Sequence, residues 1–132
     1  SYNIDNDVGN GAITMNTFSF RLFGGYKVHL DKTEMTIDYA GEKIWFIQRA
    51  KPRTKTIAYR DILRVEYKEA GMTFGYVRLI TKENEEYLSS TYVAQHDENA
   101  FMVEKDELTK LNDVLDRLKK SNKALELVHM KA

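Results

Sequence analysis

The sequence predicts a mainly β fold that is closed by one C-terminal helix, and three observations support this prediction. Apolar and polar residues alternate with period two between residues 13 and 93, as in antiparallel strands with one buried face. Turn-forming residues divide this region into short runs. From Glu104 onward the apolar spacing changes to three and four, which is typical of an amphipathic helix.

The period-two region contains eight runs that we expect to be strands. The clearest is residues 62–68, in which Leu63, Val65 and Tyr67 alternate with charged residues and are expected to face the core. The other runs are residues 13–23, 26–30, 35–39, 43–48, 54–59, 74–81 and 87–94. Gly75 interrupts one of them, so it predicts a bulge or a close approach of another backbone segment.

One helix is predicted at residues 104–120. Its apolar stripe, which is expected to dock on the sheet, consists of Leu108, Leu111, Val114, Leu115 and Leu118. Three acid-first pairs four residues apart support the helix: Asp106/Lys110, Asp113/Arg117 and Asp116/Lys120. The apolar residues after position 121 have no clear period, and they could either extend the helix or pack separately.

A chain of 132 residues fits a single domain with one core. We expect a flexible polar leader at residues 1–11, the folded domain at residues 12–120 and a C-terminal tail at residues 121–132. Within the domain, residues 12–23 are expected to form an additional N-terminal strand, and residues 104–120 the capping helix. The first residue is Ser1 and not Met, which indicates processing or excision from a longer chain.

The composition argues against several classes of protein. Twenty Lys and Arg residues balance 20 Asp and Glu residues, so nucleic acid is not an expected partner. The longest uncharged apolar run, IWFI at residues 44–47, is far shorter than the roughly 20 residues of a spanning helix. The chain has no cysteine and no signal-peptide pattern. We therefore expect a soluble cytoplasmic protein, with a peripheral position at a membrane as the alternative.

Five segments follow one another in an order that resembles the bacterial pleckstrin-homology-like (PH-like) domains. They are YKVHLDKTEMTIDY, TIAYRDILRVEY, GMTFGYVRLIT, EYLSSTYVA and the closing helix, and together they span residues 26–120. The resemblance implies a bent antiparallel sandwich or partly open barrel of about seven strands, with the helix over one open end. It also implies a non-enzymatic module, because domains of this fold bind lipid headgroups, peptides or proteins, or assemble with themselves.

The sequence has no recognisable catalytic or metal-binding motif. The three histidines, His29, His96 and His129, lie in separate segments, and none has a partner at metal-ligand spacing. No nucleophile elbow, phosphate-binding loop or dinucleotide-binding motif follows a predicted strand. We therefore expect no enzymatic activity, no metal and no cofactor.

The stretch RAKPRTK at residues 49–55 concentrates basic charge. Its bases are Arg49, Lys51, Arg53 and Lys55, and the first hairpin adds only Lys32 as a candidate for the same site. The stretch is either a solvated hairpin tip, which is the interpretation we favour, or a contact for an anionic partner. At ~1 kcal/mol per base near an anionic membrane, four bases give about 4 kcal/mol, which is only about millimolar affinity.

The predicted function is a binding or assembly module. The first hypothesis is protein–protein interaction, including self-association, through exposed sheet edges. The alternative is peripheral binding of anionic lipid or phosphate groups through residues 49–55. Trp45 has no part in either hypothesis, because we expect it to pack in the core against the leucine stripe of the helix.

Overall fold

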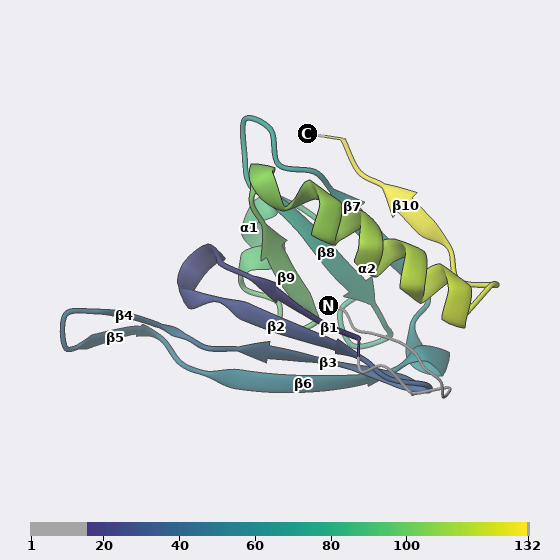
Figure 1. The fold of residues 1–132 in the computed structure, drawn as a ribbon, viewed down its shortest axis with the longest axis horizontal. Helices are drawn as coiled ribbons and strands as arrows, with labels where there is room; N and C mark the ends of the chain where they lie inside the picture. Colours follow the sequence, from purple (N-terminus) through teal and green to yellow (C-terminus); the bar gives the residue numbers. More distant parts are fainter. Residues whose placement is uncertain (1–15, 132) are drawn as a thin grey trace.

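The computed structural model describes residues 16–131, so the predicted leader lies outside the described residues. The described residues form ten strands and one long C-terminal helix, which confirms the mainly β fold (Figure 1). Eight strands belong to two four-stranded sheets, and the other two form a separate ribbon. Within residues 16–131 neither sheet closes on itself as a barrel.

The first sheet has the strand order β1-β2-β3-β6, and all neighbouring strands are antiparallel. Its strands are β1 (Asn16–Phe20), β2 (Tyr26–Leu30), β3 (Glu34–Tyr39) and β6 (Arg53–Ala58). The ribbon of β4 (Glu42–Ile44) and β5 (Ile47–Ala50) is inserted between β3 and β6. A short 3-10 turn, η2 (Leu22–Gly24), connects β1 to β2, so the predicted strand at residues 13–23 ends earlier than expected.

The second sheet has the order β10-β7-β8-β9. Its strands are β7 (Arg64–Lys68), β8 (Gly75–Ile80), β9 (Ala100–Val103) and β10 (Leu127–His129). The turn η3 (Tyr59–Asp61) connects β6 to β7, and the short helix α1 (Thr91–Gln95) lies between β8 and β9. Because β10 pairs in parallel with β7, the C-terminal tail packs on the sheet and does not extend the helix.

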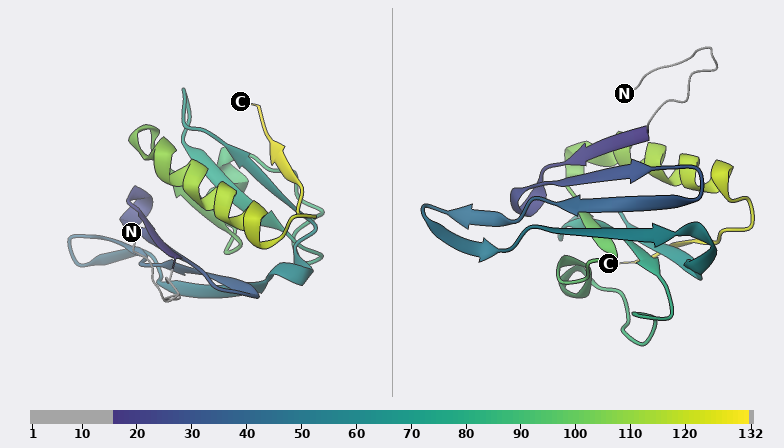
Figure 2. Two further views of the ribbon diagram at one scale, coloured as in Figure 1. Left: turned by 45° about the vertical axis from the view of Figure 1, so that its right-hand side comes forward. Right: turned by 90° about the horizontal axis from the view of Figure 1, so that it is seen from below.

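The long helix α2 (Leu108–Ser121) lies across the side where the two sheets diverge, next to β1 (Figures 1 and 2). Most of the predicted stripe is buried, namely Leu111, Val114, Leu115 and Leu118, whereas Leu108 is exposed. A reciprocal capping box of Glu104 and Glu107 precedes the helix, at the turn η4 (Lys105–Glu107). The helix position is therefore the predicted one, with its start displaced by four residues.

Two of the predicted strands are wrong. Residues 43–48 form two strands and the turn between them, and Trp45 is exposed at that turn instead of packing on the helix. Residues 87–94 form a loop and α1, because the Ser90 side chain accepts a hydrogen bond from the Val93 amide and caps a helix. Strand β9 was not predicted, because all four of its residues are buried and no alternation marks it.

Burial in β7 also differs from the predicted alternation. Glu66 and Lys68 are buried, whereas Leu63 before the strand is exposed. Ser89 donates to Glu66 at 2.5 Å, and Lys68 donates to the Phe74 carbonyl at 3.3 Å, so both charged groups have partners. The close backbone approach predicted at Gly75 is confirmed, because a Cβ on Gly75 would lie 2.6 Å from the Lys68 carbonyl oxygen.

Candidate functional site

The ribbon of β4 and β5 projects beyond both sheets (Figures 1 and 2). Ile44 pairs with Ile47 across the ribbon, so Trp45 and Phe46 are the two residues of a tight turn at its end. The projecting hairpin is residues 42–50, and its apolar tip is residues 44–47. Two-stranded hairpins are only marginally stable alone in water, so the root of this one must be held by the rest of the domain.

Exposure of the tip is the most unusual feature of the surface. The exposed fractions are 43% for Ile44, 88% for Trp45, 98% for Phe46 and 66% for Ile47. Single exposed apolar residues are common, but a contiguous group of four large ones marks a place where another surface docks. The tip is therefore a candidate contact site.

The backbone of the tip is strained. Trp45 has a φ of 60°, while the next residue, Phe46, has no positive φ. A positive φ at the first turn residue alone is the pattern of a type II′ hairpin, in which glycine is usual because it has no Cβ. A bulky aromatic residue is thus held in a conformation that costs about 1–2 kcal/mol per residue. Such local conflicts concentrate at functional positions.

The root of the hairpin is fixed by close backbone packing. A Cβ on Gly24 would lie 1.9 Å from the carbonyl oxygen of Gly41, so η2 presses directly against the start of the hairpin. The Tyr39 hydroxyl donates to the Phe23 carbonyl at 2.7 Å, which joins the same two segments. Gln48 donates to the carbonyls of Glu42 and Ala50 and ties the two strands together. The projecting hairpin is therefore anchored at its root.

Three exposed bases lie on the hairpin or at its root. Lys43 and Arg49 are exposed on the hairpin itself, and Lys51 is exposed immediately after it. None of them forms an ion pair with the residues that the structure describes. Between Lys43 and Arg53 the chain has four bases and no acid, so the local field is positive.

The other predicted anion-binding residues are occupied elsewhere. The guanidinium of Arg53 lies 4.6 Å from the ring centre of Tyr39 and donates to the Asp97 carbonyl at 3.4 Å. Lys55 donates to Glu83 at 2.9 Å and to Glu98 at 3.4 Å. The hydrogen bond to Glu83 is the largest cause of the raised pKa of Lys55. These two bases therefore contact the protein's own loop.

Lys32 is remote from this group. It lies in the turn between β2 and β3, whereas the hairpin follows the other end of β3. The structure thus places Lys43 and Arg49 on the hairpin and Lys51 at its root, and it leaves the predicted set divided. The tip is at Trp45 and Phe46, so the prediction that RAKPRTK forms the hairpin tip is wrong.

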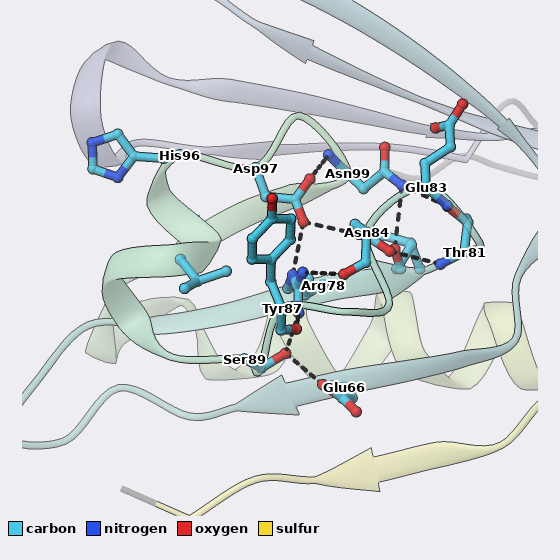
Figure 3. Close-up of polar contacts among 12 residues, drawn as sticks. Glu66, Arg78, Thr81, Glu83, Asn84, Tyr87, Ser89, His96, Asp97 and Asn99 are labelled. Atoms are coloured by element: carbon cyan, nitrogen blue, oxygen red, sulfur yellow. Dashed lines mark hydrogen bonds and ion pairs between the residues drawn. The ribbon is translucent and has the colours of Figure 1, made fainter.

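A second notable feature is a buried arginine in β8 (Figure 3). Arg78 has no exposed surface, and its Nε donates to Oδ2 of Asp97 at 2.7 Å. Its terminal nitrogens donate to the Tyr87 carbonyl at 2.7 Å, the Ser89 hydroxyl at 3.0 Å and the Asn84 carbonyl at 2.9 Å. The arginine therefore fastens the loop after β8 to the sheet and is itself fully occupied by that role.

The fastened loop borders an open hollow. The hollow has a volume of ≈ 610 Å³ and is lined by residues that include Arg53, Glu83, Tyr87, Tyr92, His96 and Glu98. The buried residue Asn99 also contributes to the wall, and its Oδ1 has no hydrogen-bond partner among the described residues. We call this feature the loop hollow. Residues 82–98, which form most of it, contain five acids and one base.

Residues 16–131 contain neither a candidate metal-binding cluster nor a helix that could span a membrane. No group of three His, Asp or Glu side chains is placed to hold a metal ion in this part of the chain. No helix in the described range is long and apolar enough to cross a membrane. At the sheet edges, β9 is buried along its length, and Lys110 of α2 donates to the Ser19 carbonyl of β1.

The sequence interpretation missed the apolar tip. The available signal was the stretch KIWFIQR, in which four apolar residues are flanked by bases and lack the alternation of a half-buried strand. We interpreted this run as core because burial is the usual fate of a large apolar side chain.

Comparisons with known proteins include one distant structural similarity. No family model matches the chain, and no curated protein matches it. Among solved structures, the hSac2 domain from the human phosphoinositide phosphatase Sac2 is similar at a TM-score of 0.48 and 12% sequence identity. The match covers 82% of this chain and 65% of that chain.

Proposed function

We propose that this protein is a binding module that attaches to anionic membrane surfaces through the β4–β5 hairpin. The observation that carries the proposal is the exposed apolar tip, with Lys43 and Arg49 on the same hairpin and Lys51 at its root. Aromatic residues favour the interface between lipid and water, where the ring is apolar and the indole N–H remains hydrated. Bases near that depth are attracted to acidic headgroups.

Neither the bases nor the apolar side chains of the hairpin would bind a membrane strongly enough alone. Three bases at ~1 kcal/mol each contribute about 3 kcal/mol. Burial of Trp45, Phe46 and Ile47 contributes about 1.5–3 kcal/mol for each side chain, hence at least about 4.5 kcal/mol. The sum of about 7.5 kcal/mol corresponds to a dissociation constant in the low micromolar range. Apolar insertion and charge attraction together are therefore adequate for reversible attachment.

The anchored root supports this proposal. Because Gly24 packs on Gly41, the hairpin presents its tip without first being ordered, and the entropy lost on binding is reduced. The PH-like assignment belongs to the same proposal. Two packed sheets with a helix over their open side agree with such a domain, and the fold then acts as a rigid support for one projecting contact element.

Vesicle co-sedimentation tests the proposal. The parent protein is expected to bind phosphatidylcholine vesicles that contain phosphatidylserine and to leave phosphatidylcholine alone largely unbound. The variant with Lys43→Gln, Arg49→Gln and Lys51→Gln should bind acidic vesicles about 100-fold more weakly, because about 3 kcal/mol of attraction is removed.

A matched control separates the site from net charge. The variant with Lys120→Gln, Lys123→Gln and Lys131→Gln has the same net charge, and these three residues are exposed outside the hairpin. It should bind acidic vesicles nearly as well as the parent. Equal losses in the two variants, or failure of the parent to bind acidic vesicles, would contradict the proposal. If the parent binds a protein and does not bind vesicles, the hairpin is a contact site for a protein partner and not for a membrane.

A further inference from the structure

We infer that the loop hollow takes the β4–β5 hairpin of a second copy of this chain, which gives a reciprocal two-fold dimer in solution. The surfaces that meet are the basic apolar hairpin of one copy and the aromatic hollow of the other, with the acids Glu85 and Glu86 at its border. This inference does not rest on the membrane proposal, although both use the hairpin.

Charge complementarity identifies the occupant. The chain from Lys43 to Lys51 has three bases and no acid, whereas residues 82–98 have five acids and one base. Three of those acids already pair within the chain, Asp97 with Arg78 and both Glu83 and Glu98 with Lys55, which leaves Glu85 and Glu86. Glu85 and Glu86 are exposed next to the hollow and form no ion pair with described residues. Because the chain as a whole is neutral, the most direct partner for each patch is the other patch on a second copy.

Apolar complementarity points to the same pairing. The hollow and its border expose Tyr87, Leu88 and Tyr92, which are 60%, 88% and 72% exposed. The hairpin tip supplies Trp45 and Phe46, which also lack a partner in the isolated chain. Aromatic side chains of this kind are the usual anchors of protein interfaces.

The hollow is preformed. Arg78 holds the Tyr87 and Asn84 carbonyls and the Asp97 side chain, so the loop does not need to be ordered when a partner binds (Figure 3).

The two contact surfaces of the proposed dimer are adjacent on one molecule, as the position of Arg53 indicates. This residue stands at the root of the hairpin, where β6 begins, and it also lines the hollow. The two halves of the interface therefore adjoin each other on the molecule. Two copies related by a two-fold axis can exchange hairpins, so that each contact is made twice and the assembly closes.

Dimerisation would cover the tips that we assign to membrane attachment. A dimer in solution and attachment to a vesicle are then mutually exclusive states of one hairpin. Acidic vesicles should dissociate the dimer, because a ligand that binds only the free hairpin shifts the equilibrium toward the monomer.

A charge-exchange experiment tests the dimer. The hairpin variant carries Lys43→Glu, Arg49→Glu and Lys51→Glu, and the hollow variant carries Glu83→Lys, Glu85→Lys and Glu86→Lys. Each variant alone should be a monomer by light scattering in the micromolar range, because like charges now face each other. An equimolar mixture should recover the dimer mass, since both contacts in the mixed pair again join opposite charges.

A control variant carries Asp61→Lys, Asp116→Lys and Glu126→Lys at exposed positions outside the hollow. Its net charge changes by the same amount as that of the hollow variant, and it should remain a dimer. Circular dichroism melting verifies that all variants are folded. A monomeric parent, a hollow variant that stays dimeric, a mixture that stays monomeric, or growth beyond two copies would each overturn the inference.

Vesicle binding distinguishes this inference from the proposed function. The hollow variant should keep its attachment to acidic vesicles, whereas the hairpin variant should lose both activities. If the parent is a dimer and does not bind vesicles, the dimer inference holds and the membrane proposal is wrong. A monomeric parent that binds vesicles would do the reverse.

Discussion

The guanidinium of Arg78 and the carboxylate of Asp97 meet at 2.7 Å, at a point where the arginine has no contact with solvent. This pair joins β8 to the loop that leads into β9. A buried charge that loses its partner is much more costly than an exposed one, so the pair makes a sharp prediction about stability.

Asp97→Ala should lower the free energy of unfolding by about 3–5 kcal/mol, because it leaves the Arg78 charge buried and unpaired. Urea denaturation followed by circular dichroism measures this change. Glu98→Ala is the matched control, since its partner Lys55 lies in an exposed pair. That loss should stay below about 1 kcal/mol. Equal effects of the two substitutions would show that Arg78 finds another partner.

Gly24→Ala should destabilise the protein and disturb the root of the hairpin. The new Cβ would meet the Gly41 carbonyl oxygen, and Gly24 has a φ of 100°. We expect a loss of at least about 1–3 kcal/mol. Gly71→Ala is the control, because nothing lies within 4 Å of its added Cβ, and its stability should change by less than about 0.5 kcal/mol. Equal melting temperatures for both variants would contradict the close packing.

Leu111→Asp and Leu115→Asp should each unfold the domain. Both side chains are buried beneath α2, and an unpaired carboxylate there costs several kcal/mol against a total stability of about 5–15 kcal/mol. Leu108→Asp on the same helix is the control, because Leu108 is exposed. Cooperative melting of the Leu111 and Leu115 variants near the parent temperature would mean that α2 is not docked.

Stability should fall at alkaline pH through buried tyrosines. Burial raises the pKa of Tyr59 from 10.0 to about 12, and its hydroxyl donates to the Asp31 carbonyl at 2.7 Å. The folded state therefore holds the proton more tightly than the unfolded state. This contribution is complete below pH 10.0 and is lost as the pH rises toward about 12. Burial also raises the pKa values of Tyr26, Tyr39 and Tyr76, which add in the same direction.

Urea denaturation between neutral and alkaline pH measures this loss. Tyr59→Phe should have a shallower alkaline decline than the parent, together with a lower stability at neutral pH by about 1 kcal/mol from the lost hydrogen bond. Tyr92→Phe should follow the parent, because Tyr92 is exposed. Parallel curves for all three proteins would contradict a raised Tyr59 pKa.

Much of the fold was predictable because several elements have one buried face. In β2 and β3 the residues alternate between buried and exposed positions, and the stripe of α2 has the helical spacing. Strand β9 lacks this signal because both of its faces are covered. Strand β10 has only three residues, so it was too short to give a period.

The candidate site was less predictable, for two physical reasons. The tip at Trp45 and Phe46 violates the rule that large apolar residues are buried, so its sequence looked like core. The burial of Arg78 depends on four hydrogen-bond partners that lie six to 19 positions later in the chain. No local sequence pattern predicts such a network. The predicted group of basic residues stays a prediction as a binding site, because its division between hairpin and loop depends on where the turn falls.

Trp45→Gly separates stability from binding. Glycine tolerates the positive φ of this position, so the variant should be as stable as the parent or more stable by about 1 kcal/mol. Its affinity for acidic vesicles should nevertheless fall, because the interfacial aromatic is gone. Urea denaturation followed by circular dichroism and vesicle co-sedimentation give the two results. A large loss of stability would instead assign Trp45 a packing role.

The fluorescence of Trp45 in the presence of acidic vesicles tests the central claim most directly. Trp45 is the single tryptophan of the chain, so the whole tryptophan signal comes from the hairpin tip. With phosphatidylserine-containing vesicles whose acyl chains are brominated, the emission should be strongly quenched, because the tip contacts the lipid. The Lys43→Gln, Arg49→Gln, Lys51→Gln variant should be quenched far less at the same lipid concentration. Emission of the parent that is unchanged by brominated acidic vesicles would contradict attachment through the hairpin.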